Sequence, residues 1–98
     1  MKPIPLTEET AAVARRIIWF EPPELALADP VRFLAYAMER ATAADLRVLH
    51  PHVSAADWRA ALAAAPPGII GPRSWAYWHA MFGTSPPPPP PNRNLSRA

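Results

Sequence analysis

Proline divides this sequence into segments too short for any long, continuous helix. The 98 residues include 15 prolines. Inside a helix, proline removes a backbone hydrogen bond and its ring clashes with the preceding turn, but in the first turn it is tolerated. A proline pair therefore marks a helix end, whereas a proline just after a capping residue marks a start. The interruptions fall at Pro22-Pro23, Pro30, Pro51, Pro66-Pro67, Pro72 and the run Pro86–Pro91.

The segments between these prolines carry helix signals. Thr7, Asp29, Thr42 and Ser54 are residue types that favour the N-cap of a helix, and the last two each precede an aspartate by three residues, as in a capping box. Apolar residues then recur at helical spacing, and no segment alternates with a period of two. We therefore expect an all-α fold, a compact bundle of about five short helices with proline-rich loops.

Four of the expected helices have further markers in the sequence. The first ends at Pro22-Pro23 and carries Phe20 in its last turn. The helices over residues 42–50 and 54–65 form an αα-hairpin. The last helix ends at Gly83, which suits a left-handed C-terminal cap.

The part of the chain that is expected to fold carries no net charge. The sequence has ten Lys and Arg against eight Asp and Glu, a formal net charge of +2, and the excess lies at Arg93 and Arg97 in the tail. Nucleic-acid binding needs Lys and Arg clustered on one face, and only Arg15 and Arg16 are adjacent. This balance disfavours DNA or RNA as a partner.

Composition excludes several other kinds of site. Without cysteine there is no disulfide, no thiolate zinc site and no iron–sulfur cluster. The apolar runs are shorter than the roughly 18–20 residues of a membrane span, and the first residues lack the apolar core of a signal peptide. A chain this short also has little room for a deep cofactor cavity. We expect a soluble, cytoplasmic protein with no cofactor.

His50-Pro51-His52 is the motif that most suggests chemistry. Two imidazoles this close can share a metal ion, which raises the hypothesis of a metal-dependent hydrolase. Such a site needs a third ligand, and only His79 remains among the histidines. A polar turn between two helices is the simpler interpretation. Because nucleophile elbows and glycine-rich phosphate loops are also missing, we expect neither an enzyme nor a metal site.

The four tryptophans are the most informative feature of the composition. Trp75 and Trp78 lie three residues apart on one face of the last helix, and we expect them to form the main core. A domain this small rarely hides four indoles completely. We therefore expect an exposed aromatic side chain in a protein-binding patch, with Trp19, Tyr36, Tyr77 or one of the other tryptophans as the candidate.

The C-terminus has its own composition. We expect a single helical domain at residues 1–84 and a flexible, proline-rich tail at residues 85–98, either disordered or in the polyproline II conformation. Pro88, Pro91 and Arg93 also match a PxxP ligand with a flanking cation. Almost any proline run before an arginine meets that pattern, so a spacer is the simpler interpretation.

Five groups of motifs follow one another between residues 15 and 83. They are Ile18-Trp19-Phe20-Glu21, then Leu27-Ala28-Asp29-Pro30 with Phe33-Leu34, then Asp45-Leu46 with Leu49, then Pro66-Pro67-Gly68-Ile69-Ile70, and finally Pro72-Arg73-Ser74-Trp75-Ala76-Tyr77-Trp78. Together they resemble a family of small, all-helical bacterial proteins whose genes often lie directly upstream of a nucleotidyltransferase-like toxin. The resemblance implies an antitoxin, or a structural partner of such an enzyme.

The leading hypothesis is a non-enzymatic protein-binding module, an antitoxin that binds and neutralises a nucleotidyltransferase-like toxin. The candidate partner-binding residues are the side chains hardest to fit into a thin core, namely Trp19, Glu21, Glu24, Arg73, Trp75 and Tyr77. Among them, Arg73 suits an ion pair with a partner carboxylate. A small, alanine-rich core also favours completion by a partner, either the toxin or a second copy in a homodimer.

The alternative hypothesis is a small helix-turn-helix regulator that binds DNA. It would use the hairpin over residues 42–50 and 54–65. The second helix of that hairpin presents Arg59 and mostly alanines, whereas base readout needs several Arg, Asn or Gln side chains. We therefore rank DNA binding below protein binding.

Overall fold

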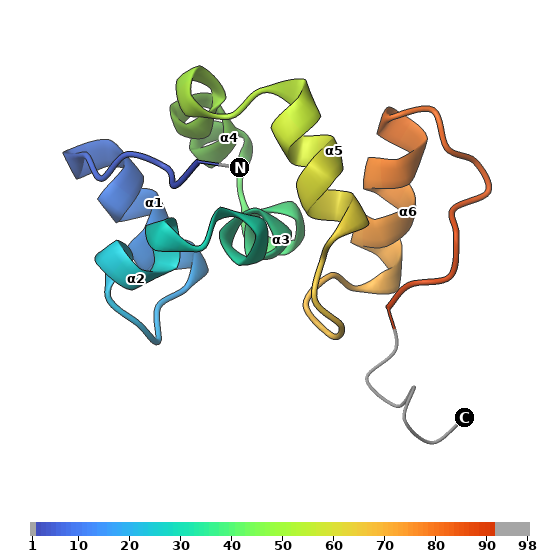
Figure 1. Ribbon diagram of the computed structural model, residues 1–98, viewed down its shortest axis with the longest axis horizontal. Coiled ribbons are helices and arrows are strands. Elements are labelled where there is room, and N and C mark those ends of the chain that lie inside the picture. The colour runs from blue at the N-terminus through green and yellow to red at the C-terminus, as the bar shows by residue number, and fades with distance from the viewer. Residues whose placement is uncertain (1, 92–98) are drawn as a thin grey trace.

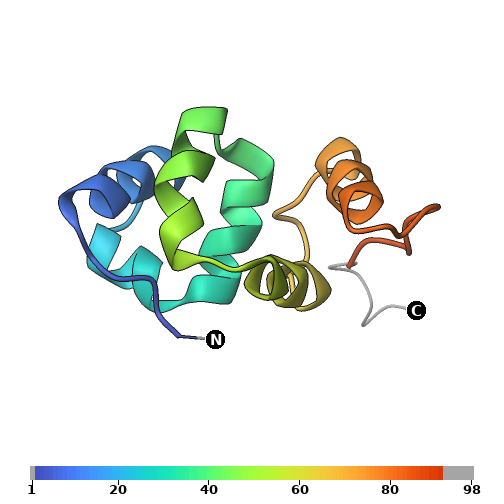
Figure 2. The same cartoon turned by 90° about the horizontal axis from the view of Figure 1, so that it is seen from above.

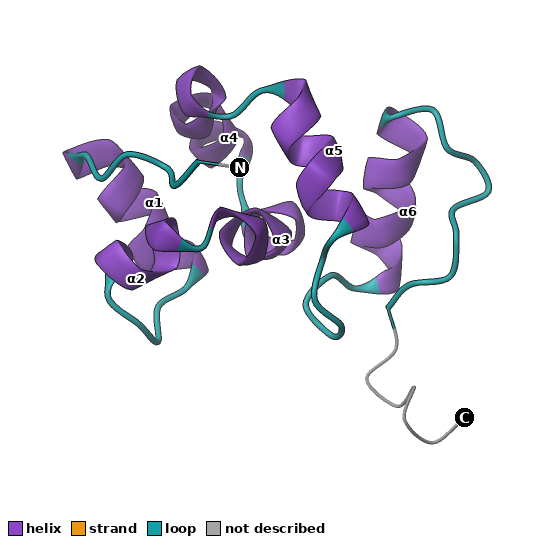
Figure 3. Cartoon of the chain, viewed as in Figure 1, coloured by secondary structure: helices purple, strands orange, loops and turns teal. Residues whose placement is uncertain are grey.

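Six α-helices and one short 3₁₀-helix make up the computed structural model, which describes residues 2–91 (Figures 1 and 3). The elements are α1 (Glu8–Ile17), α2 (Pro23–Ala28), α3 (Pro30–Arg40), α4 (Ala43–Leu49), the 3₁₀-helix η1 (His50–His52), α5 (Ala55–Ala63) and α6 (Pro72–Met81). No strand occurs in this described part of the chain. The predicted all-α fold is confirmed.

Side-chain caps fix the helix starts where the sequence predicts them. Thr7, Thr42 and Ser54 each accept a hydrogen bond from the backbone N–H three residues on, and the side chain of that third residue accepts one from the cap's own N–H. At α3, Asp29 Oδ1 accepts a hydrogen bond from the Arg32 N–H at 3.3 Å. Each cap pairs a donor that the first helical turn leaves free.

The chain around Pro22-Pro23 differs from the prediction. Ile18 is the C-cap of α1, so Trp19 and Phe20 lie in the turn after the helix and not in its last turn. Pro22 is then the N-cap of an additional helix, α2, and Pro23 is its first residue, where the missing N–H has no partner to lose. The same proline pair therefore ends one helix and starts the next, which raises the helix count above the predicted five.

Helix α3 lies at the centre of the core. It contacts α1, α2, α5 and α6, and Figure 1 shows it between the α1–α2 pair and the α5–α6 pair. Phe33 and Leu34 of α3 are both 0% exposed. They belong to one apolar cluster that also includes Ile17 of α1, Leu27 of α2 and Leu49 of α4. A single core therefore joins the helices.

Helix α6 adds its tryptophans to this core, as predicted. Trp75 and Trp78 are buried. Trp78 Nε1 donates a hydrogen bond to the Met38 carbonyl oxygen of α3 at 3.1 Å, and its ring stacks on that of Trp58 with 5.2 Å between centroids. Gly83, with a φ of 84°, ends the helix in the left-handed conformation, which confirms the predicted cap.

The proline-rich tail turns back toward the domain after α6. Its described part runs alongside α6 (Figures 1 and 2), and Trp75 Nε1 donates a hydrogen bond to the Pro88 carbonyl oxygen at 2.7 Å. This contact ties residues 85–91 to the helices, which the expectation of a plain spacer does not include. The flexibility predicted for residues 92–98, and the cation Arg93 of the PxxP pattern, lie outside the described residues.

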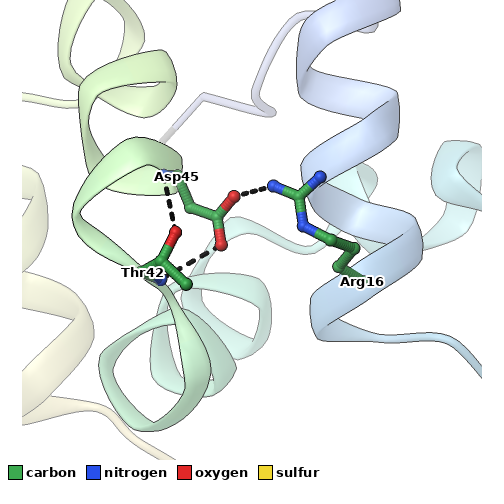
Figure 4. Close-up of polar contacts among 3 residues, drawn as sticks. All are labelled: Arg16, Thr42 and Asp45. Atoms are coloured by element: carbon green, nitrogen blue, oxygen red, sulfur yellow. Dashed lines mark hydrogen bonds and ion pairs between the residues drawn. The ribbon is translucent and has the colours of Figure 1, made fainter.

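An ion pair between Arg16 and Asp45 joins α1 to α4 (Figure 4). The Asp45 side chain is only 2% exposed, and its Oδ1 faces the Arg16 guanidinium. Its Oδ2 accepts a hydrogen bond from the Thr42 N–H at 3.1 Å. One carboxylate therefore caps α4 and also holds that helix against α1.

Candidate functional site

An exposed group of aromatic rings lies where α1 turns into α2. Trp19 is 73% exposed and Phe20 is 46% exposed, because α1 has ended before them and the turn carries their side chains away from the core. The two rings meet edge to face, with 5.3 Å between centroids. The Phe20 ring in turn lies 5.8 Å from the half-buried ring of Tyr36 on α3.

Two arginines of α3 complete this surface. Arg32, Tyr36 and Arg40 are spaced by four residues and so lie on one face of the helix. The guanidinium carbons of Arg32 and Arg40 lie 5.4 Å and 5.0 Å from the centroid of the Tyr36 ring, within cation–π range. We refer to Trp19, Phe20, Arg32, Tyr36 and Arg40 together as the Trp19 patch.

Hydrogen bonds hold both arginines in place. Arg40 Nη1 donates to the Ile17 carbonyl oxygen at 2.8 Å, which pairs a carbonyl group that the end of α1 leaves free. Arg32 Nη1 donates to Glu21 Oε2 at 2.9 Å. This hydrogen bond lowers the pKa of Glu21 below its ordinary value of 4.5 and raises the pKa of Arg32.

We expect the Glu21–Arg32 pair to stabilise the fold at neutral pH but not in acid. Because the pKa of Glu21 is lower in the folded state, its contribution is complete above about pH 4.5 and is lost as the pH falls through the lowered pKa. Glu21→Gln should therefore cost up to about 1 kcal/mol at pH 7 and nothing measurable near pH 2. Urea denaturation at both pH values measures the difference. A Glu21 pKa that Arg32→Met leaves unchanged, in a carboxyl NMR titration, would contradict the assignment.

The six partner-binding residues predicted from the sequence do not form one site. Trp19, Glu21 and Glu24 lie at the α1–α2 turn and the start of α2, whereas the other three lie on α6. Figure 1 shows these elements at opposite ends of the molecule. On α6, Arg73 and Tyr77 are exposed. Glu24 is also exposed, and Glu21 is half-buried in its pair with Arg32.

Trp75 does not belong to an exposed patch. It is 6% exposed, and its indole N–H is hydrogen-bonded to the tail. The sequence analysis places Trp75 both in the expected core and among the side chains hardest to fit into a thin core, and the structure covers it. The returning tail and the ring of His79, 4.3 Å away between centroids, provide that cover.

Sequence reasoning missed the two arginines that the structure adds to the patch. Arg32, Tyr36 and Arg40 recur at i, i+4 and i+8 along α3, so their common face is readable from the spacing alone. What the spacing does not contain is the approach of the α1–α2 turn to that face. The patch is therefore a tertiary feature.

The other sequence candidates lie elsewhere. His50 and His52 are exposed in η1 and line a groove of about 580 Å³ whose apolar wall includes Trp58 and Met81. Within residues 2–91, no three His, Cys, Asp or Glu side chains gather where they could hold a metal ion. Arg59, the candidate base-reading residue, has its guanidinium carbon 5.2 Å from the centroid of the Phe82 ring.

No protein-family model, no curated protein and no solved structure matches this chain. None of the helices in the described part of the chain has the length and apolar content needed to cross a membrane. A fold alone does not define a function, which depends on the groups that a site brings together.

Proposed function

We propose that this chain is a non-enzymatic protein-binding module that docks on its partner through the Trp19 patch. The observation that carries the proposal is the 73% exposure of Trp19 beside two further aromatic rings and two arginines. Trp, Tyr and Arg are the residue types that dominate the binding energy of protein interfaces. A partner that covers the Trp19 indole would remove a large apolar area from water, which favours association.

The geometry of the patch also suits binding. The two guanidinium groups are held by the Ile17 carbonyl oxygen and the Glu21 carboxylate, and the rings contact one another edge to face. Side chains that are already ordered lose less conformational entropy on association. The patch therefore supports tighter binding than the same residues would give on a mobile loop.

For the partner we propose a nucleotidyltransferase-like toxin, which this chain neutralises as an antitoxin in the cytoplasm. This part of the proposal rests on the resemblance carried by motifs such as Ile18-Trp19-Phe20-Glu21, which includes two patch residues. On the partner we expect an apolar pocket for the Trp19 indole, flanked by carboxylates that face Arg32 and Arg40.

Co-purification tests the proposal. The tagged chain is isolated from its native organism, and mass spectrometry identifies any protein that elutes at comparable stoichiometry. We expect a nucleotidyltransferase-like protein whose activity falls when this chain is bound. Recovery of the chain alone, or of a partner whose activity is unaffected, would overturn the antitoxin proposal.

Substitution of Trp19 tests the docking surface separately. We expect Trp19→Ala to weaken the purified complex by about 2 kcal/mol, roughly thirtyfold in Kd, as for an interface hot spot. Tyr77→Ala is the matched control, since Tyr77 is 57% exposed but lies on α6. Isothermal titration calorimetry measures both affinities. A complex that tolerates Trp19→Ala but loses affinity with Tyr77→Ala would move the docking surface to α6.

A further inference from the structure

A cleft lies between α5 and α6 on one side and the proline-rich tail, which forms its other wall, on the other. Leu62 and Ala63 of α5 line it together with Trp75 and His79 of α6, and it has a volume of about 420 Å³. The rest of its lining comes from Thr84, Pro88, Pro89 and Pro91. The tail is therefore part of this cleft and not a spacer beside it.

The contact between Trp75 and Pro88 has the chemistry of proline recognition. A proline run has carbonyl groups but no N–H groups, so donors for its carbonyl oxygens have to come from outside the run. The indole N–H of Trp75 supplies one at 2.7 Å. Domains that bind polyproline II segments present grooves lined by aromatic side chains to them in the same general way.

The Trp75 indole is held ready for this role. The ring of His79 packs against the indole with 4.3 Å between centroids, and His79 is itself positioned by the hydrogen bond that its Nδ1 donates to the backbone carbonyl oxygen of Trp75 at 2.9 Å. On the other side of the cleft, Ala63 is exposed and small, which leaves room for a bulky proline ring. A pre-formed donor and an open wall together make a binding site.

We propose that this cleft is a proline-recognition site, that the chain's own Pro86–Pro91 run is its resident ligand, and that a proline-rich segment of another protein binds there by displacing the run. The hydrogen bond from the Trp75 indole to the tail is accepted by a backbone carbonyl oxygen, and every proline segment has such an acceptor. Pro88, Pro89 and Pro90 are themselves exposed, so the resident segment is accessible to exchange. This site is independent of the Trp19 patch.

Peptide binding to the full-length chain tests the proposal. The probe is an acetylated, amidated hexaproline peptide, and a hexapeptide of alternating Gly and Ser is the control. A tail-release variant, Pro87→Ser/Pro88→Gly/Pro89→Ser, removes the resident ligand without shortening the chain. Because occupation by the tail reduces the open fraction of sites, we expect the probe to bind the release variant at least about tenfold more tightly than the wild type.

The binding site is located by NMR and by substitution in the release variant. The four tryptophans give separate indole N–H signals, and that of Trp75, assigned with Trp75→Phe, should move when the probe binds. Ala63→Gln should abolish binding by filling the open wall. Ala60→Gln, an equal change at an exposed position of the same helix that does not line the cleft, should leave it intact.

The outcomes are distinct. Binding that Ala63→Gln removes and Ala60→Gln preserves supports the proposal, with Trp75→Phe weakening it in a variant of normal helicity. A folded release variant that does not bind the probe overturns it, as does equal affinity of the release variant and the wild type. A wild-type Trp75 indole signal that shifts with protein concentration also overturns it, because the tail of a second copy would then fill the cleft.

Discussion

Phe33→Ala is expected to lower the free energy of unfolding by about 3–5 kcal/mol. Phe33 is 0% exposed and is the largest of the fully buried side chains. It belongs to α3, which contacts the helices on both sides of the core, so the cavity cannot close by the movement of one neighbour. A domain of this size has only about 5–10 kcal/mol of stability in total. The substitution therefore removes a large share of it.

Urea denaturation followed by circular dichroism measures this loss. Leu25→Ala is the control, since Leu25 is 61% exposed on α2 and its replacement should change the stability by no more than about 0.5 kcal/mol. Equal effects of the two substitutions would mean that α3 does not organise the core. A reduced slope for Phe33→Ala, without a lower midpoint, would instead point to a change in the cooperativity of unfolding.

The parts of the fold that the sequence predicts are those decided within one helical turn. The caps at Thr42 and Ser54 depend on residues three positions apart, and the left-handed end at Gly83 depends on one backbone conformation. For the proline pair Pro22-Pro23, the sequence predicts only one of its two roles. Its role as a helix end follows from the residues before it, but its role as a start depends on α2 packing against α1.

The functional surfaces cannot be predicted from local sequence patterns alone, because they depend on contacts between distant parts of the chain. Trp19 was predicted to be exposed because it was hard to bury, and the structure adds the arginine-bearing face of α3 that lies beside it. Trp75 is predicted for the same site for the same reason. Its burial depends on a hydrogen bond to a residue thirteen positions later, and no helical period predicts that contact.

The two proposed binding surfaces lie on different parts of the molecule. The Trp19 patch is formed by the α1–α2 turn and one face of α3, whereas the cleft beside Trp75 is formed by α5, α6 and the tail. A partner on one surface therefore leaves the other free. The proposals for the two surfaces can fail independently, because each has its own variants and its own ligand.

Arg16→Met is expected to cost about 1–3 kcal/mol of stability, since it leaves the buried carboxylate of Asp45 without its charged partner. Asp45 is 2% exposed, whereas Arg16 is 57% exposed. The loss of stability therefore comes mainly from the Asp45 carboxylate, which stays buried without its partner. Its Oδ2 keeps the Thr42 N–H, but Oδ1 has no hydrogen-bond donor in place of the guanidinium. Arg15→Met, an equal change at the exposed neighbouring position, is the control and should cost little.

A double-mutant cycle separates the ion pair from the packing of the arginine stem. Asp45→Asn removes the buried charge but keeps a carbonyl oxygen that can accept the Thr42 N–H bond at the cap of α4. Arg16→Met should therefore cost much less in the Asp45→Asn background than in the wild type, with a coupling of about 1–3 kcal/mol from urea denaturation. If Arg16→Met costs the same in both backgrounds, Asp45 does not depend on Arg16, and α1 and α4 are held together by their apolar contacts alone.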